Sequence, residues 1–427
     1  MEKKIVIIGA GVAGINAATK LVDNGYPGNL ITIIDKGNDP HNRLPEEVMT
    51  GMLGAGGWSD GKLTYHTAIG GVLSKYCGEE KAMELMDQVI SNFRRFHPKP
   101  EEIFCSDPQA EPDFIKPYFG LRLFPVWHIG SNYLHEIAKT WYQYLLDKGI
   151  NFEWNTEVDD IDFNHSTIYT HNATLKYDEL IFAVGKSGID FAQELSNGYK
   201  LPTEPKSVQI GVRFEAPQKY FQKLIDISYD FKLYQKFDNV SLRSFCTNNN
   251  AAYVAVEETY GDISYNGHAK KGEEFRNDMT NFGILMEIKG IENPFEWSRE
   301  VVERLQFNNT GLYYSPNKTR KPGLTSEGTV VSAHQMDDLE EFDEVLGEYA
   351  SYILDFIDQM NEVFEFGDDW GMYIPEVKYL SPEPLVDYKN LALVDYPNVH
   401  FVGDALSARG ITVSGAQGIY VAESLIK

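Results

Sequence analysis

Three glycines near the start of the chain have the spacing of a phosphate-binding turn. Gly9, Gly11 and Gly14 follow an apolar run, Lys4–Ile8, and open a helix-forming segment, Ile15–Asp23. In such a turn the first glycine makes the tight bend, the second lets a pyrophosphate approach the backbone, and the third lets the helix pack on the strand. The unpaired N–H groups at the helix N-terminus favour an anion there. The pattern predicts a dinucleotide-binding site.

A carboxylate at the end of the next predicted strand fits the same site. The strand Leu30–Ile34 ends in Asp35, whose side chain can accept a hydrogen bond from a ribose hydroxyl. We assign Lys36, the following residue, to the same site. Strand, glycines, helix, strand and acid occur in the order that a dinucleotide-binding βαβ unit requires.

The composition limits the classes of function. The chain has 427 residues, of which 43% are hydrophobic, and at roughly 150 residues per domain this length predicts two or three domains. The net charge of −25 argues against broad electrostatic binding of nucleic acid or of an anionic membrane. No segment approaches the roughly 18 apolar residues of a membrane span, so we expect a cytoplasmic protein. The 3 cysteines are far apart and the 10 histidines lack ligand spacing, so we expect no metal site.

The order of the predicted elements indicates an α/β protein whose first domain is discontinuous. Residues 1–200 run from the glycine-rich turn through a predicted β-meander to an apolar strand that ends at Gly185. Residues 376–427 return to nucleotide-binding character, because they contain a strand that ends in Gly403 and Asp404.

The segment between these two parts has a different pattern. Residues 201–375 contain strand-like runs rich in β-branched and aromatic residues, such as Val208–Glu215. A long apolar stripe predicts one helix over Leu339–Phe364. The predicted fold class is therefore a Rossmann-like domain with a β-meander, interrupted by an inserted α+β substrate domain.

These motifs together resemble the FAD-binding domain of flavoproteins with two dinucleotide-binding domains, and most closely a group of bacterial FAD-dependent dehydrogenases. The closer resemblance depends on five further motifs, which are Gly56–Leu63 with its Ser59-Asp60-Gly61-Lys62-Leu63 block, His128–Ser131, Gly185–Gly188, Ile210–Glu215, and Arg409–Ile411 after Gly403-Asp404. The resemblance implies that the first domain binds FAD and that the inserted domain binds the substrate.

The resemblance also implies a set of FAD-binding residues. The residues that match are Gly9, Gly11, Gly14, Asp35, Lys36, Val158, Gly185, Gly403, Asp404, Gly415 and Gly418. Val158 would meet the adenine through its backbone, and Asp404 would bind oxygens of the ribityl chain or near the pyrophosphate. Gly415 and Gly418, expected at a helix N-terminus, would direct N–H groups at the N1/O2 edge of the flavin.

Three residues are candidates for catalysis. A reduced flavin carries negative charge near N1 and O2, which a cation can stabilise, and Lys62 and Arg409 are the candidate cations. His128 is a candidate acid–base group. The chain departs from its relatives at Cys246–Asn250, an Asn-rich segment where they have a Cys-Pro-Gly-Gly turn, so the identity of the substrate is not carried over.

The resemblance implies an FAD-dependent oxidoreductase that transfers a hydride between flavin N5 and a small-molecule substrate. No second G-x-G-x-x-G occurs, so we expect NAD(P)H to bind transiently at most. A narrower alternative is an oxidase of C–N bonds in amines or amino acids, with Arg213 or Arg409 holding the substrate carboxylate. Two alternatives from other classes are a flavoprotein that modifies nucleic acid and a non-catalytic FAD-binding module.

Overall fold

The computed structural model describes residues 2–44, 47–59, 61–71, 73–108, 110–204, 207–259, 261–269, 273–325, 328–378 and 383–426. The chain divides into two compact units. The first unit consists of Met1–Ser106, Pro125–Glu204 and Ser381–Lys427, and the second of Asp107–Phe124 and Pro205–Leu380. Each unit has its own hydrophobic core.

A mostly parallel sheet forms the centre of the first unit. In the part of the chain that the structure describes, it has six strands in the order β23-β24-β11-β1-β2-β7, and only the edge strand β23 runs antiparallel. Every residue of β1, β2 and β11 is buried, as expected of parallel strands covered on both faces. The strands are β1 (Ile5–Ile8), β2 (Ile31–Ile34), β7 (Asn151–Glu153), β11 (Glu179–Phe182), β23 (Ala392–Leu393) and β24 (Tyr396–Phe401).

The strand order reverses between β1 and β11. From β1 the chain continues to β2 and then β7 on one side, whereas β11 and β24 lie on the other side. In open α/β sheets such a reversal leaves a crevice at the carboxyl ends of the strands, where ligands bind. The fold therefore locates a ligand site beside the glycine-rich turn that follows β1.

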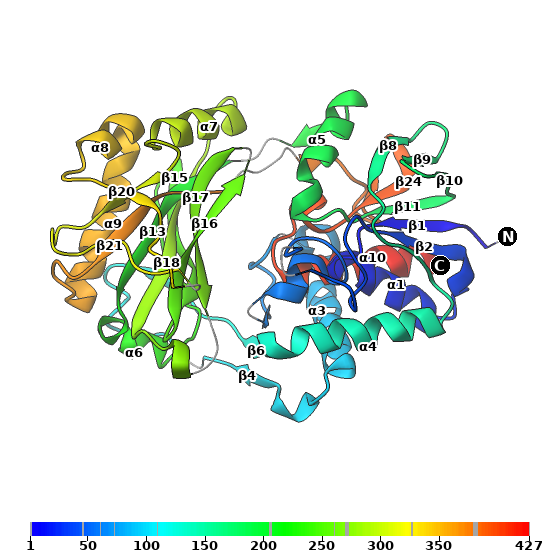
Figure 1. Ribbon diagram of the computed structural model, residues 1–427, viewed down its shortest axis with the longest axis horizontal. Coiled ribbons are helices and arrows are strands. Elements are labelled where there is room, and N and C mark those ends of the chain that lie inside the picture. The colour runs from blue at the N-terminus through cyan, green and yellow to red at the C-terminus, as the bar shows by residue number, and fades with distance from the viewer. Residues whose placement is uncertain are drawn as a thin grey trace. The chain divides into compact units, whose positions relative to one another are not determined.

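Helices and small sheets complete the first unit. The C-terminal helix α10 (red) lies beside α1 (blue) in Figure 1, which joins the two ends of the chain in one unit. The helices are α1 (Val12–Asp23), α2 (Leu73–Cys77), α3 (Glu79–Phe96), α4 (Leu134–Asp147), α5 (Ile189–Gly198) and α10 (Ile411–Ile426). The remaining strands are β3 (Lys62–Thr64), β4 (Phe104–Ser106) and β6 (Val126–His128), the meander β8 (Val158–Asp162), β9 (Thr167–Thr170) and β10 (Thr174–Lys176), and the pair β12 (Thr203–Glu204) and β22 (Glu383–Pro384).

The second unit is built on an eight-stranded mixed sheet, counted over the described residues, in the order β20-β19-β21-β13-β18-β15-β14-β5. Its strands are β5 (Gly120–Arg122), β13 (Val208–Pro217), β14 (Lys232–Lys236), β15 (Val240–Asn248), β18 (Met279–Ile288), β19 (Gly311–Tyr314), β20 (Ala333–Gln335) and β21 (Gly371–Lys378). A hairpin of β16 (Ala252–Thr259) and β17 (Asp262–Ala269) accompanies it, with helices α6 (Gln222–Ile225), α7 (Pro294–Arg304), α8 (Glu340–Leu346) and α9 (Glu348–Phe364).

The two faces of this sheet differ in polarity. Alternate residues of β13 such as Val212 and Phe214 pack in the core that also contains Phe342 of α8 and Phe356 of α9. The other alternate residues, which include Arg213 and Glu215, lie on the opposite face. Figure 1 shows α8 and α9 on one side of the sheet and the β16–β17 hairpin on the other.

The fold class that we expected from the sequence is confirmed: a discontinuous Rossmann-like unit with a β-meander is interrupted by an α+β unit. The division of the chain differs from the expected one in two respects. Asp107–Phe124, which we placed in the first domain, belongs to the second unit because β5 pairs with β14 and Phe119 is buried in the second core. The inserted part also runs from 205 to 380 rather than from 201 to 375.

The long helix that we expected over Leu339–Phe364 is wrong in one respect. The helix is interrupted at Gly347, which adopts φ 56° and ψ −132° between α8 and α9. A periodic apolar stripe continues across this break, so hydrophobic spacing alone did not reveal it.

None of the helices within the described ranges is long and apolar enough to cross a membrane.

Candidate dinucleotide site

A cavity of about 600 Å³ lies at the carboxyl ends of the parallel strands in the first unit. Its volume is within the roughly 300–1,000 Å³ of cofactor and ligand pockets. The last residues of β1 and β2 contribute to its lining, together with the segments that follow β1, β2 and β11 and the start of α10. The cavity therefore occupies the crevice that the strand order predicts.

The three glycines have different surroundings in the turn after β1. A Cβ at Gly14 would lie 2.1 Å from the carbonyl oxygen of Gly9, and a Cβ at Gly9 would lie 2.2 Å from that of Ala183. Gly11 differs, because no atom of the described residues lies within 4 Å of the position that its Cβ would take. Gly11 also lines the cavity. Gly9 and Gly14 thus permit close packing, whereas Gly11 leaves open space for a ligand.

Asp35 lines the cavity and also organises the backbone around it. Its carboxylate accepts hydrogen bonds from the N–H groups of Ala10 at 2.8 Å, Gly37 at 2.8 Å and Gly51 at 2.7 Å. An ionised carboxylate has about four lone-pair positions. Oδ1 receives two of these bonds and Oδ2 receives one, so Oδ2 can accept one more from a ligand hydroxyl.

Lys36 lines the cavity next to Asp35. Its ammonium group donates to the carbonyl oxygen of Ser187 at 3.3 Å and lies 3.7 Å from Glu157. Val158 and Gly185 also line the cavity. The structure therefore brings these four residues predicted for cofactor binding, Asp35 and Lys36 included, to one cavity.

Arg43 supports the loop beside the cavity, a role that sequence analysis missed. Its guanidinium group donates hydrogen bonds to the carbonyl oxygens of Glu47 at 3.0 and 2.9 Å, Met52 at 2.7 Å and Gly54 at 2.9 Å. Burial lowers the pKa of Arg43 to about 10. These bonds hold the loop before Gly54–Trp58, whose first residues line the cavity. An arginine in a polar loop has no periodicity or spacing that would have revealed this role.

Helix α5 supplies a second group of lining residues that the sequence analysis did not single out. Asp190, Phe191 and Glu194 face the cavity from the first turns of this helix. They follow the Gly185–Gly188 motif directly. The helix that begins directly after this motif is the sequence feature that could have identified them.

Gly403 and Asp404 follow β24 and line the cavity on the side of α10. Arg409 donates from Nη1 to Asp404 Oδ1 at 2.6 Å. Burial raises the pKa of the Asp404 carboxyl, and the guanidinium of Arg409 opposes this change. Arg409 itself is not among the described residues that line this cavity; it lines a smaller neighbouring one.

The expected position of Gly415 and Gly418 at a helix N-terminus is wrong. Helix α10 begins at Ile411, so both glycines lie inside it. A Cβ at Gly418 would lie 2.1 Å from the carbonyl oxygen of Ala13, and one at Gly415 would lie 2.9 Å from Val89. The two glycines therefore allow close helix packing.

The N-terminal turn of α10 still faces the cavity. Gly410, Ile411 and Ser414 contribute to the lining. The first turn of a helix has N–H groups without helical partners and a positive dipole end. A helix N-terminus that can stabilise an anion therefore does face the cavity, but it lies at Ile411, four positions before Gly415.

Lys62 and His128 are brought together away from this cavity. They lie opposite each other on the antiparallel strands β3 and β6. The His128 ring stacks on Phe104, with centroids 4.6 Å apart, and its Nε2 is 2.7 Å from Ser106 Oγ. Neither residue belongs to the described lining of the cavity. Asp60 of the neighbouring motif lies outside the described residues.

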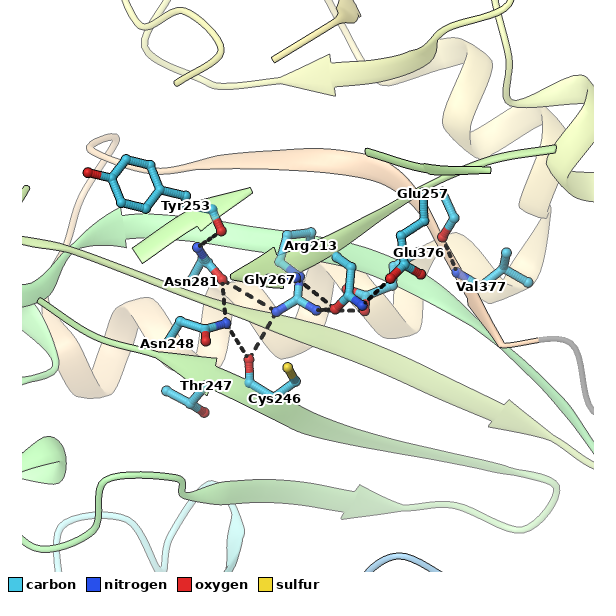
Figure 2. A network of polar contacts seen from close by, with 12 residues as sticks. Arg213, Cys246, Thr247, Asn248, Tyr253, Glu257, Gly267, Asn281, Glu376 and Val377 are labelled. Atoms are coloured by element: carbon cyan, nitrogen blue, oxygen red, sulfur yellow. Dashed lines mark hydrogen bonds and ion pairs between the residues drawn. The ribbon is translucent and has the colours of Figure 1, made fainter. Parts of the chain in front are cut away.

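Arg213 is not placed to hold a substrate carboxylate, because its side chain is fully buried and both of its terminal nitrogens are already hydrogen-bonded. Figure 2 shows it in a buried network on the polar face of the second unit's sheet. It donates to Glu376 Oε1 at 2.6 Å, Asn266 Oδ1 at 3.0 Å and the carbonyl oxygen of Cys246 at 3.1 Å. The side chain of Arg213 is 0% exposed. The expectation that Arg213 holds the carboxylate of an amino-acid substrate is therefore wrong.

No protein-family model and no curated protein matches the chain. Among solved structures, the chain is similar to a variant of the halogenase PltM in complex with FAD, at 13% identity and a TM-score of 0.42 over 100% of this chain and 70% of that one. A flavoprotein/dehydrogenase from Cytophaga hutchinsonii aligns at 12% identity and a TM-score of 0.40, over 99% and 78% of the two chains. A variant of 2-methyl-3-hydroxypyridine-5-carboxylic acid oxygenase aligns at 12% identity and a TM-score of 0.39, over 100% of this chain and 83% of that one. Since such values carry no functional argument, function is inferred from the residues of this chain.

Proposed function

We propose that the protein is an FAD-dependent oxidoreductase acting on a small molecule. The observation that carries this proposal is the open space above Gly11 at the N-terminus of α1, in a cavity of about 600 Å³ that also exposes Asp35 and Asp404. A pyrophosphate needs the open space and the helix N-terminus, and hydroxyl groups need carboxylate acceptors. The residues present therefore fit a dinucleotide with a long hydroxylated chain.

The chain's own residues would divide the work of holding this cofactor. The N-terminal N–H groups of α1 would bind the pyrophosphate, and the remaining lone pair of Asp35 would orient the adenosine ribose. Val158 would lie against the adenine, and Asp404 would accept hydrogen bonds from the ribityl chain. The start of α10 would stabilise negative charge at the other end of the cofactor.

When bound, FAD supplies transfer of a hydride at its N5 atom. The protein contributes the position of the cofactor and the electrostatic field around it. Residues 1–427 contain one glycine fingerprint of this kind, so we propose that electrons come from a small-molecule substrate or from NAD(P)H that binds transiently.

Anaerobic reduction tests the catalytic part of this proposal. The purified, FAD-loaded protein is mixed without oxygen with NADH, NADPH, and panels of amines, amino acids and alcohols, and the flavin absorption is followed. We expect at least one donor to reduce the bound flavin much faster than it reduces free FAD. Bound flavin that dithionite reduces, but that every donor reduces no faster than free FAD, would identify a binding module instead.

A further inference from the structure

A second cavity lies beside the dinucleotide site in the first unit. Its volume is about 350 Å³, and it is enclosed by α5 and the residues after it, together with Phe401 and the segment from Asp404 to Arg409. This volume is near the lower end of the roughly 300–1,000 Å³ of small-molecule sites. Asp404 contributes to both cavities and so forms part of the wall between them.

The charged groups of the second cavity have a positive balance. Lys200 and Arg409 line it, and Asp404 is the one carboxylate in the described lining. Arg409 uses Nη1 for Asp404, and its Nε is buried without a hydrogen-bond partner among the described residues. Two cations and one carboxylate leave one net positive charge in this lining, although the protein's total charge is −25. A local cationic site of this kind attracts a small anion.

The rest of the lining defines the other end of the ligand. Ile189, Leu201 and Phe401 are buried and apolar, and they line the same cavity as the two cations. Sites of this type bind the apolar body of a ligand on such side chains and orient it through a few polar groups. The cavity therefore suits a compact molecule with an apolar part and one anionic group.

We propose that this second cavity binds a small organic monocarboxylate. Arg409 and the exposed Lys200 supply the positive charge that a carboxylate requires, and a guanidinium group is a preferred hydrogen-bond donor to carboxylates. One negative charge balances the site, whereas the two charges of a phosphate monoester would leave an excess beside Asp404. The proposal concerns a cavity distinct from the dinucleotide site and does not depend on which cofactor binds there.

Calorimetric titration of the purified protein with sodium benzoate tests the proposal. We expect saturable binding with one site per chain, weaker binding of phenyl phosphate, and no binding of benzyl alcohol. Lys200→Glu reverses the charge at the rim, and Ser196→Phe fills the cavity from α5. Each substitution should weaken benzoate binding by about tenfold or more.

Lys148→Glu is the matched control, because it makes the same charge change at an exposed position at the end of α4. It should leave the dissociation constant of benzoate within about twofold of the original value. Circular dichroism verifies that each variant is folded. The proposal is overturned if folded protein does not bind benzoate, if phenyl phosphate binds more tightly than benzoate, or if both cavity variants bind benzoate as well as the control does.

Discussion

At Gly11 and Gly14, an added methyl group should have opposite consequences. At Gly14 it would meet the carbonyl oxygen of Gly9 at 2.1 Å, whereas at Gly11 it would enter open space of the cavity. We expect Gly14→Ala to lower the free energy of unfolding of the apoprotein by about 2 kcal/mol or more. We expect Gly11→Ala to change that free energy by less than about 1 kcal/mol and to weaken FAD binding by about tenfold or more.

Urea denaturation of the apoprotein and fluorescence titration with FAD measure the two effects. Each glycine serves as the control for the other, because the substitution is the same. Equal FAD affinity of Gly11→Ala and the original protein would show that the pyrophosphate does not approach this turn.

The carboxyl group of Glu376 should make stability depend on pH. Burial raises its pKa from 4.5 to about 7, against the effect of Arg213 and Lys378, and Glu257 raises it further. As pH rises from about 4.5 to about 7, the unfolded chain loses this proton while the folded chain retains it, so the free energy of unfolding falls. Between about pH 5.5 and about pH 7.5 this single group should account for a loss of about 2 kcal/mol.

Glu376→Gln removes this titration and keeps the shape of the side chain. Urea denaturation at both pH values should therefore show a smaller loss of stability in the variant than in the original protein. Parallel losses in the two proteins would show that Glu376 has an ordinary pKa in the folded state.

At the residue scale, local geometry was the most predictable feature. The bend at Gly9, with φ 105°, and the close packing at Gly14 follow from a spacing within one turn, and Asp35 follows at the end of the next strand. The positions of Lys62 and His128 depend on the pairing of β3 with β6, strands more than 60 positions apart, which local spacing does not determine. The partner of Arg213 is Glu376, more than 160 positions away, and no sequence pattern joins the two.

Among the elements, the β16–β17 hairpin has a specific packing requirement at one glycine. At Gly267 of β17, a Cβ would lie 2.2 Å from Asn248 Nδ2 and 2.6 Å from both Arg213 Nη1 and Asn281 Oδ1. The backbone of the hairpin at Gly267 therefore packs directly against the buried polar network of Figure 2. This contact depends on the absence of a side chain at Gly267.

We expect Gly267→Ala to lower the free energy of unfolding of the second unit by about 1–3 kcal/mol or more, because the network must shift to accept the methyl group. Gly323→Ala in the same unit is the control, since its Cβ would make ordinary contacts, the nearest at 3.4 Å. Thermal unfolding monitored by circular dichroism measures both. If Gly267→Ala is no less stable than Gly323→Ala, the hairpin does not lie on the network as described.

Element boundaries show which features of the sequence carry information. The strands around the glycine-rich turn were found within a residue or two, because continuous apolar runs mark a buried parallel sheet. The start of α10 was placed too late, because Ser414–Gly418 has the composition of a helix opening. Strand β14 was missed, since Lys232–Lys236 is short and mostly polar, with Leu233 as its one aliphatic residue.

At the scale of the whole molecule, two units with separate cores should respond differently to a cofactor. The cavity assigned to FAD is lined only by described residues of the first unit. A ligand at about 100 times its dissociation constant stabilises the folded state that binds it by about 2.7 kcal/mol. We expect scanning calorimetry to show that FAD raises the transition of the first unit and leaves that of the second unit nearly unchanged.

The Gly267→Ala variant identifies the transition of the second unit in the same experiment. This substitution should lower the midpoint temperature of the transition that FAD does not move. If FAD and Gly267→Ala affect the same single transition, the two units unfold together.

The division of the molecule was the most predictable large-scale feature. Nucleotide-binding motifs at both ends of the chain indicate a discontinuous domain, and the change in composition after residue 200 marks an insertion. The excursion of Asp107–Phe124 into the second unit was not predictable, because its pairing partner β14 follows more than 100 residues later.

The visible absorption spectrum of the purified protein tests the central claim most directly. We expect bands near roughly 370 and 450 nm, in the protein as isolated or after incubation with FAD, and release of FAD on denaturation. A folded protein that is colourless and does not take up added FAD would contradict the assignment of the cavity around Gly11, Asp35 and Asp404.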